Sequence, residues 1–221
     1  MLQTILYPNQ SEYPSICERP QLDAASLDQL MEEIFREVKV KGDQALIDYT
    51  YQFENRQIES VQYTEQEISS IASQVNTELK KSIEVAFSNI YKFHESQKHE
   101  VKKVETSPGV ICWQKASPIE KIGIYIPGGT APLFSTIMML AIPAKIAGCN
   151  EIILATPATD PAIFYAAKLC GVTQMIKVGG AQAIAAMALG TQQVPKVYKI
   201  FGPGNQYVTA AKMFANRKGI A

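Results

Sequence analysis

Hydrophobic and polar residues alternate with a helical period through the first hundred residues. A first apolar stripe consists of Leu27, Leu30, Met31, Ile34, Phe35 and Val38. Spacings of three and four predict an amphipathic helix there, with Ser26 as its N-cap. After Gly42, a second stripe consists of Ala45, Leu46, Tyr49 and Phe53. Thr64 and Glu67 form a capping-box pattern at the start of a third helix, and a longer helix follows with its own stripe from Leu79 to Tyr91.

The pattern changes after Gly109 to short apolar segments that alternate with helical ones. Strands are predicted at 110–113, 122–126, 151–155, 174–178 and 197–201, and helices at 133–147, 161–170, 180–189 and 205–215. Strands that alternate with helices of about ten residues indicate βαβ units and a parallel sheet. The expected fold class is therefore α/β, a helical N-terminal arm followed by a Rossmann-like, mostly parallel α/β domain.

Three regions follow from this change of pattern. Residues 1–20 are expected to form an N-terminal extension, residues 21–120 a helical arm with the first strands, and residues 121–221 the Rossmann-like domain. The arm contains no catalytic cluster, so we expect it to act as a scaffold. The histidines, His94 and His99, stand five positions apart near its last helix and do not share a helix face as a metal-binding pair would.

The formal charge is zero, with 21 basic and 21 acidic side chains among 221 residues. Residues 1–120 nevertheless carry 12 basic and 19 acidic side chains, and residues 121–221 carry 9 and 2. Either the two segments pack against each other, or the second receives an anion such as a nucleotide phosphate. Charge alone favours packing, and the balanced total disfavours a nucleic-acid partner.

The chain is expected to be cytoplasmic, with no membrane partner. The uncharged run at 122–144 is long enough to span a bilayer, but Pro127, Gly128 and Pro132 interrupt it. No signal-peptide pattern opens the sequence. The four cysteines are widely spaced without a C-x-x-C pair, which indicates reduced thiols rather than a disulfide framework or a zinc knuckle.

Glycine-containing turns follow three of the predicted parallel strands, at 127–129, 179–180 and 202–205. All three turns belong to one edge of the sheet, where glycine lets a ligand approach the backbone and the next helix offers free N–H groups. The three turns together favour a nucleotide or similar ligand. They do not form the G-x-G-x-x-G fingerprint, and no acidic residue follows the first strand at the spacing expected for ribose binding.

Three polar side chains stand beside these turns, namely Tyr125, Gln182 and Asn205. A phenol or carboxamide there can hydrogen-bond a ribose, a phosphate or a nicotinamide amide. The alternatives are a core aromatic for Tyr125, a helix-surface residue for Gln182 and an N-cap for Asn205. The residues alone favour neither the ligand-binding interpretation nor these alternatives.

Four blocks in this half resemble the signature regions of histidinol dehydrogenases: residues 124–136, 143–149, 178–185 and 201–205. The resemblance implies NAD-dependent oxidation of L-histidinol to L-histidine by a zinc-containing homodimer in histidine biosynthesis. It places NAD contacts on Tyr125, Gln182 and Asn205. The adjoining turn residues complete the expected cofactor site: Pro127, Gly128, Gly129, Gly180 and Gly204.

The resemblance departs from the family at the end of the sequence. The family's zinc ligands and its glutamate–histidine general base correspond to positions beyond residue 221. Residues 121–221 are therefore expected to be an NAD-side domain truncated at its C-terminal end, with no catalytic residue or metal ligand in this chain. We expect the chain to be inactive alone and to form a homo-oligomer. The alternatives are a non-catalytic nucleotide-binding or scaffolding module, and a family relative that acts on another alcohol.

Overall fold

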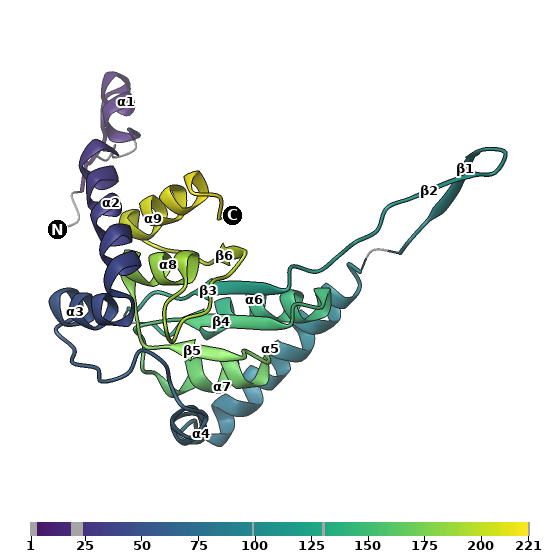
Figure 1. The fold of residues 1–221 in the computed structure, drawn as a ribbon. Helices are drawn as coiled ribbons and strands as arrows, with labels where there is room; N and C mark the ends of the chain where they lie inside the picture. The colour runs from purple at the N-terminus through teal and green to yellow at the C-terminus, as the bar shows by residue number, and fades with distance from the viewer. Residues whose placement is uncertain (1–3, 19–23, 99, 130, 221) are drawn as a thin grey trace.

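A four-stranded parallel sheet forms the centre of the computed structural model, which describes residues 4–18, 24–98, 100–129 and 131–220. Its strands are β3 (Lys121–Tyr125), β4 (Glu151–Ala155), β5 (Gln174–Ile176) and β6 (Lys199–Phe201). The order across the sheet is β5-β4-β3-β6, and each neighbouring pair is parallel (Figure 1). This confirms the α/β fold class.

The helices that connect these strands divide between the two faces of the sheet. They are α6 (Phe134–Ala147), α7 (Pro161–Leu169), α8 (Gly180–Leu189) and α9 (Gln206–Arg217). Helices α6 and α7 pack together in one buried cluster, and α8 and α9 pack in the other. From β3 the chain adds β4 and β5 on one side and then returns to add β6 on the other side, so the direction of strand order reverses at β3. Ligands bind at such a reversal point in open α/β sheets.

The helices of the N-terminal arm also divide between the faces. They are α2 (Ala24–Lys41), α3 (Asp43–Glu54), α4 (Glu65–Ser73) and α5 (Thr77–Glu95). Helices α2 and α3 pack on α8, and α2 also packs on α9, whereas α4 and α5 pack on α6 and α7. Figure 1 shows the arm on both sides of the sheet. Before it, η1 (Gln10–Glu12) and α1 (Tyr13–Ile16) bury no residue.

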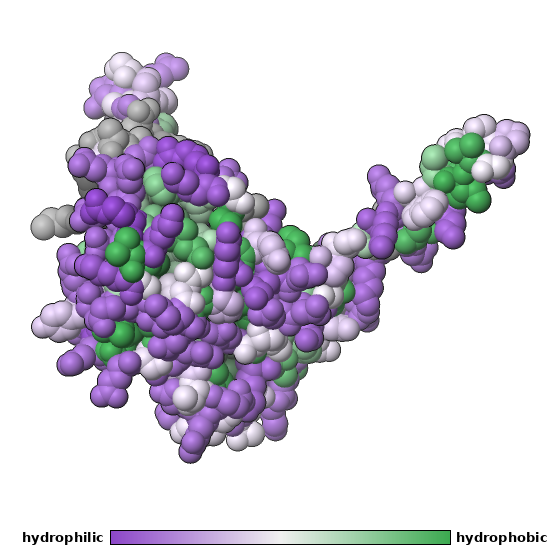
Figure 2. Space-filling model, in the orientation of Figure 1, coloured by the Kyte–Doolittle hydropathy of each residue, from purple (hydrophilic) through white to green (hydrophobic). Residues whose placement is uncertain are grey.

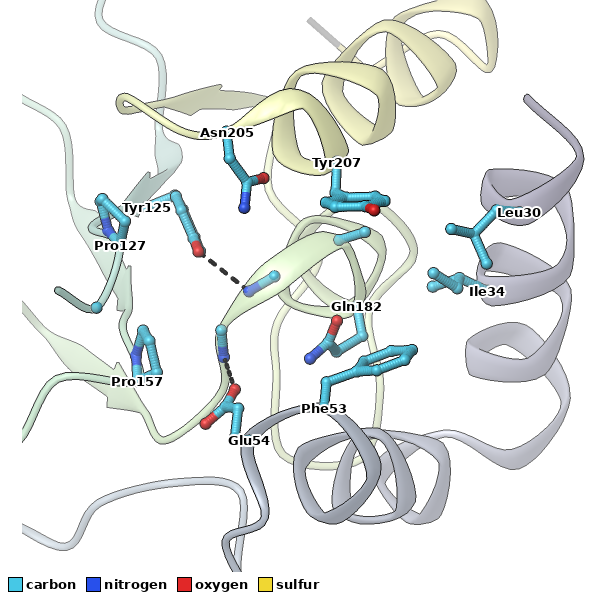
Figure 3. A pocket seen from close by; sticks show the side chains of 14 residues that line it. Leu30, Ile34, Phe53, Glu54, Tyr125, Pro127, Pro157, Gln182, Asn205 and Tyr207 are labelled. Carbon is cyan, nitrogen blue, oxygen red and sulfur yellow. Dashed lines mark hydrogen bonds between the residues drawn. The ribbon is translucent and has the colours of Figure 1, made fainter. Parts of the chain in front are cut away.

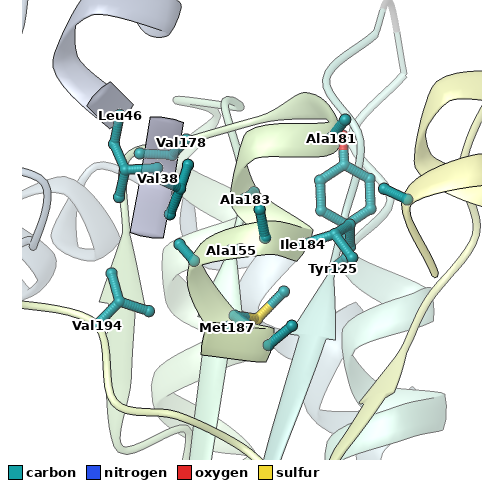
Figure 4. Close-up of a cluster of buried hydrophobic side chains, with 14 of the residues drawn as sticks. Val38, Leu46, Tyr125, Ala155, Val178, Ala181, Ala183, Ile184, Met187 and Val194 are labelled. Atoms are coloured by element: carbon teal, nitrogen blue, oxygen red, sulfur yellow. The ribbon is translucent and has the colours of Figure 1, made fainter. Parts of the chain in front are cut away.

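Alternating side chains of the strands enter two separate cores. On β3, Ile122 and Ile124 belong to the α6–α7 core, whereas Tyr125 belongs to the α8 core (Figure 4). Gly123 lies between Ile122 and Ile124 in the strand, and a Cβ on it would come within 2.6 Å of Met187 Sδ on α8. Glycine at this position lets α8 pack closely on the sheet.

The observed bounds differ from the expected ones mainly at the ends of elements. The strand at 151–155 and the helix at 180–189 have the expected bounds, but β5 ends at Ile176 and β6 begins at Lys199. The Ser26 prediction is wrong, because α2 already includes Ala24, so Ser26 lies within its first turn. The apolar stripe defines which face is buried, but it does not define where the first turn starts.

A β-hairpin projects away from the body of the protein (Figure 1). Its strands β1 (Lys103–Ser107) and β2 (Val110–Trp113) pair antiparallel, and every residue of both strands is exposed. Gly109 permits the turn with its φ of 81°. The strand expected at 110–113 is thus confirmed, but it belongs to this hairpin rather than to the central sheet.

Ion pairs connect the acidic first segment to the basic second segment. Lys177 Nζ lies 2.7 Å from Glu67 Oε1, and Arg217 Nη2 lies 2.6 Å from Asp28 Oδ1. Lys168 lies near Glu65 at 3.4 Å. The opposite charges therefore face each other across the contact between the two segments, as the packing interpretation predicts.

The apolar run at 122–144 forms a strand, a turn and a helix rather than one long helix. Within the described ranges, no helix has the length and hydropathy needed to cross a bilayer. All four cysteines are free thiols, of which Cys149 and Cys170 are buried. Burial raises the pKa of the Cys170 thiol to about 12, so it stays protonated and unreactive at neutral pH.

The Glu67–Lys177 pair gives a testable pH dependence. The hydrogen bond from Lys177, with further bonds from Thr64, lowers the pKa of the Glu67 carboxyl. The pair therefore stabilises the fold above the ordinary glutamate pKa, and this stability is lost as pH falls through the lowered pKa. Glu67→Gln keeps the helix cap and removes the charge, so we expect the free energy of unfolding to fall by about 0.5–1 kcal/mol at neutral pH.

Urea denaturation over a series of pH values measures this difference, which should shrink as pH falls through the lowered pKa of Glu67, because the protonated carboxyl is then as uncharged as the glutamine that replaces it. Glu65→Gln is the matched control, because Glu65 is more exposed and its ion pair is longer. We expect a smaller effect from it. A Glu67→Gln difference that does not change with pH would contradict the role given to the ion pair.

Candidate functional site

A pocket of about 570 Å³ opens at the carboxyl edge of the sheet (Figure 3). It lies where the turns after β3, β5 and β6 meet the arm helices α2 and α3. Its lining residues are Leu30, Ile34, Phe53, Glu54, Tyr125, Pro127, Gly128, Pro157, Gly179, Gly180, Ala181, Gln182, Asn205 and Tyr207. The three side chains singled out in the sequence, Tyr125, Gln182 and Asn205, therefore share one pocket.

Tyr125 is both a core aromatic and a lining residue. It ends β3, is 3% exposed, and its phenol oxygen accepts a hydrogen bond of 3.0 Å from the Gly180 N–H. Burial raises the pKa of this phenol, and the nearby Glu54 carboxylate raises it further. The phenol therefore stays protonated at neutral pH, and its own O–H is left to donate toward the pocket.

Gln182 is a buried polar residue in the first turn of α8. It is 2% exposed, so the helix-surface alternative is wrong. No hydrogen bond of its carboxamide occurs within the described part of the chain, although the side chain lines the pocket. Among the described residues, Thr50 Oγ1 is the one fully buried side-chain polar atom without a partner, so the carboxamide atoms of Gln182 reach the open space of the pocket. Both the donor and the acceptor of Gln182 are therefore available to a bound molecule.

Asn205 is the N-cap of α9, which confirms the N-cap alternative. Its Oδ1 accepts a hydrogen bond of 3.1 Å from the Val208 N–H. The cap fixes the side chain, and Figure 3 shows it pointing into the pocket beside Tyr125. Because the oxygen accepts this capping bond, the Nδ2 group remains as a donor for a ligand. The two alternatives for Asn205 are thus compatible.

The turn residues divide into pocket-lining and structural ones. Pro127, Gly128 and Gly180 line the pocket, whereas Gly129 lines an adjoining hollow. Gly204 is not among the lining residues, and a Cβ on it would come within 2.3 Å of Val208 Cγ1. The close packing of the turn against α9 therefore explains why this position is a glycine.

The strictest glycine requirement lies at Gly202, directly after β6. Its φ is +134°, and a Cβ there would come within 2.0 Å of the Tyr125 carbonyl oxygen. Any other residue would therefore push the end of β6 away from the end of β3. This close approach holds Asn205 and Tyr125 on the same side of the pocket.

Sequence reasoning missed the residues that the arm contributes. Leu30 and Ile34 of α2 and Phe53 and Glu54 of α3 form one wall of the pocket. The expectation that the arm acts only as a scaffold is therefore incomplete. The helical period predicts that Leu30 and Ile34 face inward, but no local signal indicates that Glu54 meets the turn after β5.

Metal-ligating groups do not gather in the described part of the chain, where no cluster of three or more His, Cys, Asp or Glu side chains occurs. His94 Nδ1 lies 2.8 Å from Gln97 Oε1 at the end of α5, and His99 lies outside the described residues. The described side chains thus suit a polar ligand held by hydrogen bonds, and they offer no binding set for zinc.

Known proteins of one family match almost the entire chain. The family model "Histidinol dehydrogenase" matches residues 17–220. Histidinol dehydrogenase of Bacteroides thetaiotaomicron is 50% identical over 226 residues, covering 100% of this chain and 53% of the relative. The enzyme of Buchnera aphidicola is 51% identical over 210 residues, covering 94% of this chain and 48% of the relative.

A solved structure agrees with these matches. The crystal structure of histidinol dehydrogenase from Elizabethkingia anophelis superposes with a TM-score of 0.88 at 47% identity, covering 97% of this chain and 51% of that one. The chain thus spans about half the length of the relatives it matches. A family model that matches nearly every residue shows that this chain belongs to the histidinol dehydrogenase family.

Proposed function

We propose that this chain is the NAD-binding half of a histidinol dehydrogenase, which oxidises L-histidinol to L-histidine in the last steps of histidine biosynthesis. The observation that carries the proposal is the meeting of Tyr125, Gln182 and Asn205 in one pocket at the strand-order reversal. Relatives that are about half identical to the chain carry the name of this oxidoreductase.

The pocket has the size and donors that a dinucleotide needs. Its volume of about 570 Å³ is within the usual range for small-molecule sites. The N–H groups of Gly179 and Gly180 are bonded to Glu54 and Tyr125, so a phosphate would be held by the N–H groups of Ala181 and Gln182 in the first turn of α8. The apolar wall formed by Leu30, Ile34 and Phe53 suits the flat face of an aromatic base. When bound, NAD would accept a hydride from the alcohol.

Each polar residue of the pocket has a defined part in this proposal. Tyr125 donates a hydrogen bond from its phenol O–H to the ligand, while the Gly180 N–H donates one to the phenol oxygen. Gln182 offers a donor and an acceptor that have no partner among the described residues, which suits an amide or a ribose hydroxyl. Asn205, fixed by its capping bond, donates from a position beside Tyr125. Together these groups orient the nucleotide rather than carry out proton transfer.

The zinc site and the general base belong, in this proposal, to the half of the family's length that this chain does not span. Oxidation of an alcohol needs a base to remove its proton, and the family's zinc would orient the alcohol. We therefore propose that the chain alone binds the nucleotide without turning over histidinol. Its cytoplasmic location stays a prediction.

The Gln182 carboxamide provides a first test. Gln182→Met removes its hydrogen-bonding groups with little change in volume, so we expect NAD affinity to fall by about fivefold to tenfold in calorimetric titration. Thermal stability should not decrease, because no hydrogen bond within the described protein is lost. Gln206→Met is the matched control, since Gln206 does not line the pocket. Absence of NAD binding by the unchanged chain would refute the proposed function.

A second test asks whether nucleotide binding belongs to this chain and catalysis to the other half of the family's length. Purified chain supplied with L-histidinol, NAD and Zn²⁺ should form no NADH above background. Co-expression with the C-terminal half of a relative should restore NADH formation, because the missing base and metal ligands are then supplied. Substituting Gln182→Met in the co-expressed pair should reduce the restored rate at limiting NAD. Oxidation of L-histidinol by the chain alone would disprove the proposal that the catalytic groups lie in the other half.

We also propose that the chain associates with a second copy through its projecting hairpin. Val104, Val110, Ile111 and Trp113 are each at least half exposed there, and Figure 2 shows hydrophobic side chains gathered on the hairpin. An isolated two-stranded hairpin with such side chains is only marginally stable in water. Contact with another subunit would cover it.

Light scattering tests this association. Ile111 and Trp113 are two positions apart in β2, so their side chains point to the same face of the strand. Ile111→Thr combined with Trp113→Ser should therefore shift the measured mass from that of a dimer or larger oligomer toward that of a monomer. Val40→Thr is the control, because Val40 is an exposed apolar residue on α2. A monomeric wild-type chain, or a doubly substituted chain of unchanged mass, would contradict the role of the hairpin.

A further inference from the structure

Glu54 gives the pocket its one carboxylate. Among the described residues that line the pocket, it alone carries a formal charge at neutral pH, and none carries a positive one. It is the last residue of α3, and Figure 3 shows it reaching toward the turn after β5. An acidic group at this point is unexpected in a site for an anionic nucleotide, so its position calls for a specific role.

Contacts on both sides fix the Glu54 carboxylate. Its Oε1 accepts a hydrogen bond of 3.0 Å from the Gly179 N–H, and its Oε2 lies 2.8 Å from Arg56 Nη2. Arg56 is itself held by a hydrogen bond to the Lys177 carbonyl oxygen. Arg56 Nε donates a further hydrogen bond of 3.3 Å to Oε2, so three of the about four acceptor sites of the carboxylate are occupied and about one remains for a ligand.

The place of Glu54 on the sheet indicates which part of a dinucleotide it faces. A Cβ on Gly179 would come within 2.8 Å of both Glu54 Oε1 and Pro157 Cγ, so the carboxylate lies beside the turns after β4 and β5. In Rossmann-type sites, an acidic residue near the end of the second strand binds the hydroxyls of the adenosine ribose. Here β4 is the second strand of the sheet, and the turn that follows it, 156–158, contains no acidic residue.

We propose that Glu54 of the helical arm replaces this missing acid, accepts a hydrogen bond from a hydroxyl of the adenosine ribose and selects NAD against NADP. The inference rests on the proposed NAD site. A 2′-phosphate would be placed against a carboxylate whose nearest positive group, Arg56, is already paired with it. Removing the charge of Glu54 would both weaken the bond to the ribose and free Arg56 to receive a phosphate.

Calorimetric titration with NAD and with NADP tests the proposal on the wild-type chain and on Glu54→Gln. Glutamine keeps an acceptor for the Gly179 N–H. The wild type should bind NAD more tightly than NADP, and Glu54→Gln should reduce the ratio of the two affinities by about tenfold, with NADP binding strengthened. Glu59→Gln is the matched control, because Glu59 is exposed and does not line the pocket.

A second measurement needs no variant. If Glu54 rejects the 2′-phosphate by charge, the preference of the wild-type chain for NAD should decrease as salt is raised to about 1 M. Wild-type binding of NAD with an affinity ratio that neither Glu54→Gln nor salt changes would overturn the role of Glu54 and leave the NAD site intact. Failure of the wild type to bind NAD at all would instead overturn the proposed function, and this inference with it.

Discussion

A parallel sheet is apolar on both faces, and both faces must be covered for it to exist in water. The four strands of this chain meet that constraint with two layers on each side: α6 and α7 beneath α4 and α5, and α8 and α9 beneath α2 and α3. The N-terminal helices therefore complete the same two cores that the strands begin. They are part of the body of the protein rather than an appendage.

This covering requirement also builds the pocket. Helix α3 packs on α8, so its last residues reach the carboxyl edge of the sheet, where the turns after β3 and β5 end. Phe53 and Glu54 thereby lie in a site whose residues from the α/β segment begin at Tyr125, 71 positions after Glu54 in the sequence. The same packing that stabilises one face of the sheet provides one wall of the site and its carboxylate.

Charge follows the same division. The acidic arm and the basic α/β segment form ion pairs between Glu67 and Lys177 and between Asp28 and Arg217. These opposite charges of the two segments therefore pair with each other inside the fold. None of the residues that line the pocket is basic. A nucleotide in this site would therefore depend on backbone amides and on neutral side chains, and its selectivity would depend on where the Glu54 carboxylate lies.

The sequence by itself determined the class of the fold and three polar residues of the site. Periods of 3.6 and 2 residues are local, and a turn between a parallel strand and a helix always lies at one edge of the sheet, so Tyr125, Gln182 and Asn205 were predictable as neighbours. Only the tertiary structure decided that Gln182 faces the pocket rather than the helix surface and that Glu54 reaches Gly179. Those facts depend on how helices from distant parts of the chain pack on one sheet, and no local pattern of residues records that packing.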